Sequence, residues 1–229
     1  MFRTTRTLIV TSILAVLLTQ TAEAQSSEVG LGLGTFNYTG DLVKFYNFKF
    51  SKPAATVFYR ANLSSVVSFR AAITAGLIGA SEVPTDAFAS KRNSSFKHFL
   101  FEGSTVMEYH FLNWRDSKRF VRFTPYLFGG VALFGFSGDV DRTQAYSTVQ
   151  MAIPFGGGVK YVLNPKWYLS LEFGMRKTFF DYLDNISGGD FRNKNYQYGN
   201  DSNNDHYYFL GFSITRTFYT IPCPTNPYK

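Results

Sequence analysis

Two long segments with a period of two, residues 151–163 and 167–180, most constrain what this chain can fold into. A period of two places alternate side chains on opposite faces of a β-strand. In the second segment one face is apolar from Trp167 to Met175, and the other carries Glu172 and Arg176. Asn164-Pro165-Lys166 separates the two segments and is a turn signal. Long strands with one apolar and one charged face are typical of a transmembrane β-barrel wall, with lipid outside and a polar interior.

The N-terminus has the features of a secretory signal peptide. Arg3 and Arg6 precede an apolar core from Leu8 to Leu18, and Ala22-Glu23-Ala24 follows as a cleavage site. This core is shorter than the roughly 20 residues that a membrane-spanning helix needs. We therefore expect residues 1–24 to be removed on export.

The composition agrees with an exported barrel. Aromatic residues make up 18% of the chain, with 25 Phe and 15 Tyr, and barrels place such residues on their lipid face and interfacial girdles. The formal net charge is +7 and falls to +6 without the signal, which holds two Arg and one Glu. Because the basic residues are scattered, we expect anionic lipid headgroups rather than nucleic acid as the counter-charge. A soluble β-sandwich is the alternative.

The alternation recurs along the chain and predicts six further strands, at residues 28–38, 54–61, 67–77, 96–111, 120–136 and 208–218. Connections after the odd-numbered strands are long, and those after the even-numbered strands are short. Short periplasmic turns and long outside loops are typical of outer-membrane barrels, so we expect the loops near Val83, Ala145 and Asn195 outside the cell. The sequence predicts an all-β, eight-stranded antiparallel transmembrane β-barrel of the outer membrane at residues 25–219. Residues 220–229 are predicted to form a periplasmic tail.

Charged residues fall on the predicted inner face of the strands. Eight strands enclose a lumen that side chains can just fill, which excludes a wide pore. The charges could form a path for ions or protons, or they could be paired with one another. Because buried charges are tolerated when they are paired, we favour interior ion pairs. The predicted set, to which Arg60 and Lys160 also belong, contains Arg70, Glu102, Glu108, Arg122, Glu172 and Arg176.

The pattern of His, Ser and Cys residues does not predict an enzyme. Some small barrels are lipid-modifying hydrolases, which need a base within hydrogen-bond reach of the nucleophile. His98 and Ser104 share a strand face, but six residues separate them by roughly 20 Å along a strand. Spacing suggests no other Ser and His pair, and the chain has one Cys and no spaced His cluster. We expect no catalytic, cofactor or metal site and no small-molecule substrate, with a lipid-modifying enzyme kept as an alternative.

The predicted periplasmic side carries the candidate contacts for a partner. A Trp beside an Arg in the turn 113–119 is a frequent binding anchor, although a Trp in the headgroup girdle explains the pattern equally well. The tail is rich in Pro and holds the lone Cys, which in an oxidising compartment is a free thiol or half of an intermolecular disulfide. The predicted partner surface contains Trp114, Arg115, Lys118, Arg119 and Cys223.

Three blocks of sequence resemble the PorG-type outer-membrane proteins of the type IX secretion system of Bacteroidetes. The blocks are FTPYLFGG at 123–130, AIPFGGGVK at 152–160 and RKTFFDYLD at 176–184. The opening VGLG at 29–32 and the Cys-Pro of the tail fit as well, whereas the first loop and residues 190–204 match nothing in that family.

This resemblance implies a non-enzymatic secretion component of the cell outer membrane. It would be associated on its periplasmic side with the ring built from the PorK lipoprotein and PorN. Such systems export proteins and, in gliding bacteria, support surface motility. The alternative is a freestanding OmpA- or OmpX-like barrel that acts in adhesion or envelope integrity.

Overall fold

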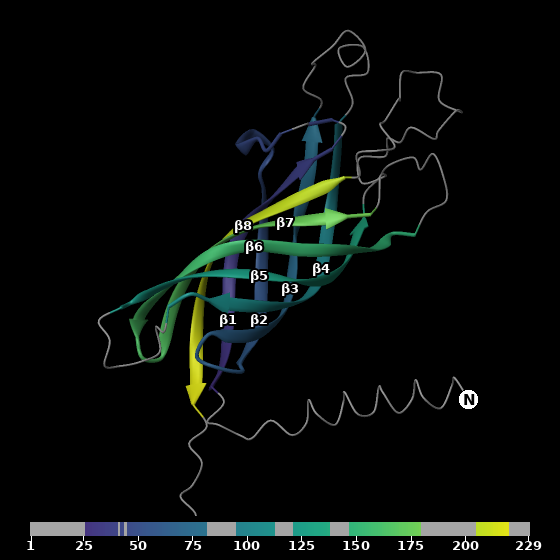
Figure 1. The fold of residues 1–229 in the computed structure, drawn as a ribbon. Helices are drawn as coiled ribbons and strands as arrows, with labels where there is room; N and C mark the ends of the chain where they lie inside the picture. The colour runs from purple at the N-terminus through teal and green to yellow at the C-terminus, as the bar shows by residue number, and fades with distance from the viewer. Residues whose placement is uncertain are drawn as a thin grey trace, which may run out of the picture.

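The protein is a closed barrel of eight antiparallel strands, in which each strand pairs with the next and β8 pairs with β1 (Figure 1). The computed structural model describes residues 26–40, 42–43, 45–81, 95–112, 121–137, 147–179 and 205–219. The strands are β1 Ser26–Thr39, β2 Lys52–Asn62, β3 Val67–Ser81, β4 Ser95–His110, β5 Phe123–Ser137, β6 Val149–Asn164, β7 Trp167–Thr178 and β8 His206–Tyr219. A short 3-10 helix, η1 Phe48–Phe50, lies between β1 and β2. The predicted eight-stranded antiparallel barrel is confirmed.

The two ends of the barrel differ in the connections they carry. The turn end holds the short connections 63–66 and 165–166, together with the first residue of β1 and the last residue of β8. The opposite end, called here the loop end, is where β3, β5 and β7 finish. Within the described residues, no helix is long and apolar enough to cross a membrane.

Two predicted strand boundaries are wrong. Gly79 was expected in a connection, but β3 continues to Ser81 and stays paired with β4 through its last residue. The fifth strand was expected from Phe120, but β5 begins at Phe123, where pairing with β6 starts. The connection from β4 to β5 therefore takes in residues 111–122 and is as long as the connection 40–51. Long and short connections thus alternate less strictly than the sequence indicated.

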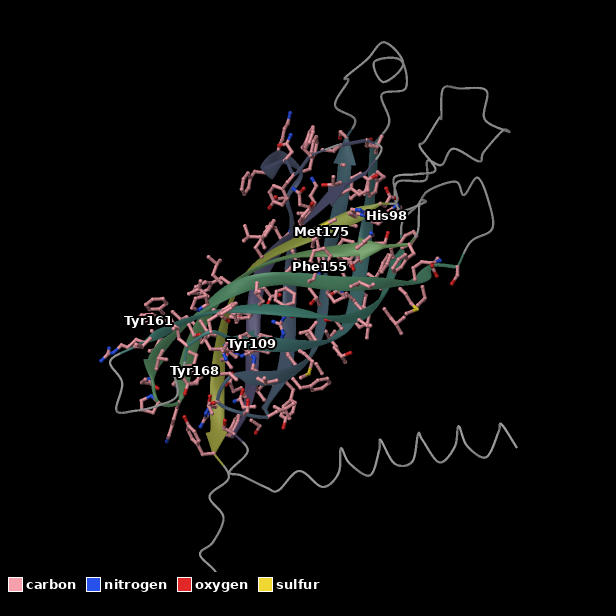
Figure 2. All side chains as sticks on the ribbon, viewed as in Figure 1. His98, Tyr109, Phe155, Tyr161, Tyr168 and Met175 are labelled. Atoms are coloured by element: carbon pink, nitrogen blue, oxygen red, sulfur yellow. The ribbon has the colours of Figure 1, made fainter. Side chains whose placement is uncertain are left out.

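The outer surface of the wall is apolar along the middle of every strand, and Figure 2 shows side chains such as Phe155 and Tyr161 extending from it. Leu33 of β1 is 74% exposed and Phe212 of β8 is 52% exposed. A continuous apolar girdle of this kind is far larger than the patches that soluble proteins tolerate. The soluble β-sandwich is therefore wrong, because one sheet closes on itself with its apolar face outward.

Glycines on the inner face make room for aromatic rings from the neighbouring strand. Gly30 pairs with Phe58, and a Cβ on this glycine would lie 2.2 Å from the phenyl ring. In the same way, the ring of Tyr126 lies over its pairing partner Gly158. These small residues thus let rings fill the interior of a narrow and curved wall.

An apolar cluster fills the lumen at the loop end. Two residues of the connection 40–51, Leu42 and Val43, are buried in it. Phe36 of β1 packs edge-on against Tyr207 of β8, with ring centroids 5.6 Å apart. The cluster contains Phe36, Tyr38, Leu42, Val43, Ala54, Ile78, Ala80, Phe96, Leu100, Ala132, Phe134, Phe136, Ala152, Tyr207 and Phe209.

Candidate functional site

Between the apolar cluster and the turn end, eight buried charged side chains fill the lumen, four cationic and four anionic. They come from six strands, and the period of two brings each one to the inner face. Within this set the formal charges cancel. This interior charge network contains Glu28, Arg60, Arg70, Glu102, Glu108, Lys160, Glu172 and Arg176.

The part of the network nearest the turn end is built around Arg60 and Glu28. Arg60 Nη1 lies 2.7 Å from Glu28 Oε2, and Arg60 Nε lies 2.7 Å from Glu108 Oε2. Lys160 Nζ lies 3.0 Å from the same Glu28 oxygen. The amide of Asn62 donates to Glu28 Oε1 at 2.8 Å. Both Glu28 oxygens are therefore satisfied in a region from which water is excluded.

Arg70 connects this part to the middle of the lumen. Its Nε lies 2.9 Å from Glu108 Oε1, and its Nη1 lies 2.5 Å from Glu172 Oε2. The hydroxyl of Tyr126 donates to the same Glu172 oxygen at 3.2 Å. The Arg70 guanidinium lies 5.3 Å from the ring centroid of Phe128, within the range of a cation–π contact.

The network ends beneath the apolar cluster. Arg176 Nε lies 3.3 Å from Glu102 Oε2, and the Tyr207 hydroxyl donates to this oxygen at 2.7 Å. Arg176 Nη2 lies 4.0 Å from Glu172 Oε1, which links these residues to the rest of the network. Tyr207 also belongs to the apolar cluster, so the charged and apolar parts of the interior are in direct contact.

The structure places seven of the eight predicted interior residues in this network: Arg60, Arg70, Glu102, Glu108, Lys160, Glu172 and Arg176. Arg122 is the exception and corrects the prediction. It is exposed and precedes β5, and its carbonyl accepts a hydrogen bond from Val162 N at 2.7 Å. The alternating pattern does not predict which way its side chain faces, because Arg122 lies before the first residue of the strand.

Glu28 was missed as an interior residue. The signal was present, because in the predicted strand 28–38 Glu28 has the same parity as Gly30 and Gly32, opposite to the apolar Val29 and Leu31. The predicted partner residues Trp114, Arg115, Lys118, Arg119 and Cys223 lie outside the described residues. The same holds for the predicted signal peptide, the tail, and the loops near Val83, Ala145 and Asn195.

The described interior contains a small cavity. In the middle of the lumen a cavity of about 20 Å³ is bordered by Arg70, Glu172 and Arg176 and by small polar residues of neighbouring strands. A space of this size holds about one water molecule. The geometry therefore favours paired structural charges over a continuous path for ions.

The register of β3 and β4 brings together a Ser and a His that sequence spacing did not suggest. Ser68 Oγ lies 3.4 Å from His110 Nε2, and both side chains are buried. Glu108 Oε2 lies 3.4 Å from that same nitrogen. In a catalytic triad the acid holds one imidazole nitrogen while the other faces the serine. Here Ser68 Oγ and Glu108 Oε2 both contact Nε2 of His110, which differs from the arrangement in a triad. The Ser68 hydroxyl donates to Asn62 Oδ1 at 2.8 Å.

The described residues hold no group of three or more His, Cys, Asp or Glu side chains arranged to bind a metal ion. The interior charge network is a set of ion pairs that share members within the barrel. These ion pairs fill the lumen and connect the strands on which their members lie.

A family model described as "Domain of unknown function (DUF6089)" matches residues 6–226. The chain belongs to the DUF6089 family. No curated protein matches the sequence. The DUF6089 match extends over all eight strands of this chain.

Solved structures align with this chain at low sequence identity. Neisserial surface protein A is 12% identical and aligns with a TM-score of 0.54 over 86% of this chain and 100% of that chain. Ail, the attachment invasion locus protein of Yersinia pestis, is 10% identical, with a TM-score of 0.47 over 86% of this chain and 100% of that chain. The outer membrane protein OprG from Pseudomonas aeruginosa is 11% identical, with a TM-score of 0.46 over 88% of this chain and 99% of that chain.

Proposed function

We propose that this DUF6089 barrel is a non-enzymatic component of the type IX protein secretion machinery in the outer membrane. The observation that carries the proposal is the filled lumen. With an apolar cluster at one end and paired charges below it, the barrel leaves no passage for a polypeptide in its described part. Its contribution to export is therefore structural, and cargo crosses the membrane elsewhere.

The three blocks that resemble PorG-type proteins support this assignment, and they are neighbours in the barrel. They begin on β5, on β6 and near the end of β7. Tyr126 and Phe128 of the first block lie over Gly158 and Gly156 of the second. The resemblance thus extends to residues that shape one part of the interior wall.

The apolar outer wall supports a location in the outer membrane, where the turn end would face the periplasm. The proposed partner is a PorK/PorN-type periplasmic ring. The contacts would come from Trp114, Arg115, Lys118 and Arg119 of the connection 111–122 and from the tail that bears Cys223. This connection is longer than the other two at the turn end, which gives it reach for such a contact.

Deletion of the gene, followed by an assay of secreted cargo, tests the proposed function. Export should be lost while the envelope stays intact. Complementation with a variant carrying Trp114→Ala and Arg115→Ala should weaken co-purification of the ring, although the barrel still inserts. A matched variant that lacks residues 82–94, at the loop end, should retain the ring. Retention by the first variant and loss by the second would place the partner surface on the opposite side of the membrane.

A freestanding barrel in adhesion or envelope integrity is the second candidate. The fold shared with Neisserial surface protein A favours it, since that barrel is named as a surface protein. In this case the deletion strain would export cargo normally and would show weaker adhesion or greater sensitivity to detergent. A change in lipid A mass in the same strain would point instead to a lipid-modifying enzyme.

A further inference from the structure

The connection between β1 and β2 passes over the rim of the barrel and packs on both sides of the wall. Leu42 and Val43 are buried in the apolar cluster inside. The following residues, 45–51, are called here the outer clamp and include η1 near the loop end (Figure 1). Tyr46 of the clamp lies against the outside of the wall, whereas Phe50 packs against the apolar cluster.

The clamp is held to the outer surface of β1 by hydrogen bonds. Asn37 follows the outward-facing positions Leu33 and Thr35 in the alternation of β1, yet its side chain is only 1% exposed. Its amide donates to the carbonyl of Asn47 at 2.6 Å and to Ser51 Oγ at 3.1 Å. The amide nitrogen of this polar side chain on the apolar wall thus finds two acceptors in the clamp that covers it.

Aromatic contacts fix the clamp on β7 and β8. The ring of Tyr46 packs edge-on against Phe173 of β7 and Tyr208 of β8, with centroid separations of 5.8 and 5.4 Å. These two rings are stacked on each other at 5.6 Å. Tyr46 also packs edge-on against Phe48 of η1 at 5.0 Å. The clamp therefore extends the apolar surface of the wall outward.

Two large side chains of the clamp face away from the protein. Phe45 is 82% exposed and Phe48 is 74% exposed. The wall beneath them indicates their depth. On β7 the outward positions run from Phe173 through Met175 to the exposed Lys177, so Tyr46 contacts the wall two outward positions below a charged residue. Charged residues mark the headgroup level of a barrel, and apolar residues below them face acyl chains.

We propose that the outer clamp is a lipid anchor, which inserts Phe45 and Phe48 among the acyl chains of the outer leaflet. Lys49, the next residue in the chain, then lies at the level of the anionic lipid phosphates. Lipid is the occupant because the clamp is continuous with the apolar wall on which Tyr46 packs. The inference rests on the membrane location given in the proposed function, and not on the secretion role.

Depth measurements by spin labelling test the anchor. The protein is purified from membranes in a Cys223→Ser background, which removes the only native Cys. Phe45→Cys, Phe48→Cys and Lys49→Cys are labelled one at a time with a nitroxide, in vesicles of phosphatidylethanolamine and phosphatidylglycerol. Collision with oxygen is compared with collision with a water-soluble nickel chelate. Phe212→Cys on the apolar wall and Leu63→Cys in the turn 63–66 are the references for lipid and water.

Labels at 45 and 48 should match the lipid reference, with an oxygen-to-nickel ratio several times that of Leu63→Cys, and the label at 49 should be intermediate. Labels at 45 and 48 that resemble the water reference would overturn the proposal. Tyr46→Ala should mobilise the label at 48, whereas Tyr46→Phe, which keeps the ring contacts, should not. Equal mobility in both variants would also contradict the anchor. The vesicles contain no secretion partner, so either outcome leaves the test of export independent.

Discussion

The charges inside the barrel show how individual residues are made compatible with a water-poor interior. Glu108 contacts two guanidinium groups, those of Arg60 and Arg70, at 2.7 and 2.9 Å. Removing one member of a buried ion pair lowers the free energy of unfolding by more than the pair contributes to it, because the remaining charge stays buried without its partner. The interior charge network therefore fills the lumen and also favours the strand register in which each charge meets its partner.

Glu108→Gln tests this argument. It removes the negative charge between Arg60 and Arg70 and should lower the free energy of unfolding by about 3–5 kcal/mol. Arg122→Gln is the matched control, because Arg122 is exposed before β5 and its substitution should change stability by less than about 0.5 kcal/mol. Denaturant unfolding of both variants in lipid vesicles provides the measurement. Equal stability of the two variants would contradict the role assigned to the network.

At the scale of elements, β5, β6 and β7 fit together by matching rings to glycines. Phe128 of β5 pairs with Gly156 of β6, and its ring also lies against Gly174 of β7. The alternation in the sequence predicts which residues face inward, but a ring and a glycine meet only if the register is correct. A slip of one residue would exchange the two faces of a strand. The contacts between rings and glycines therefore depend on how neighbouring strands pair, which the sequence of one strand does not show.

Gly156→Ala should therefore disturb the wall. A Cβ at this position would lie 2.3 Å from the carbonyl oxygen of Phe173 and 2.5 Å from Cα of Gly174, where backbone cannot yield. We expect a loss of about 1–3 kcal/mol, typical of overpacking. Gly129→Ala on the adjacent strand is the control, since a Cβ there meets nothing within 4 Å. The two variants are compared by their unfolding midpoints in vesicles, and similar midpoints would argue against the close approach at Gly156.

At the scale of the molecule, the architecture followed from the sequence more fully than the site did. A period of two predicts all eight strands and their faces, because apolar residues that face lipid alternate with residues that face the lumen along each strand. Strand ends were harder to place, since at Arg122 the alternating pattern continues beyond the paired residues. The outer clamp could not be predicted, because the packing of Tyr46 on Phe173 joins residues far apart in the chain.

The filled lumen leads to a prediction for the whole barrel. Reconstituted in a planar bilayer, the protein should give no stable conductance, because buried side chains of the apolar cluster and the interior charge network fill the described lumen. Single-channel recording over a range of voltages provides the measurement, with a protein-free bilayer as the baseline. A steady ohmic current would show that the interior opens, and the structural role in secretion would have to be reconsidered.

The orientation of the barrel gives the last prediction. The short connections 63–66 and 165–166 lie at the turn end, with the first residue of β1 and the last residue of β8. Outer-membrane barrels keep short turns in the periplasm, so the loop end should face outside. Epitope tags inserted near Val83, Ala145 and Asn195 should bind antibody on intact cells, whereas a tag at Asn164 should bind only after the outer membrane is permeabilised. Labelling of the Asn164 tag on intact cells would show that the barrel is inverted. The proposed ring contact would then face outside the cell, and the lipid anchor would lie on the periplasmic side.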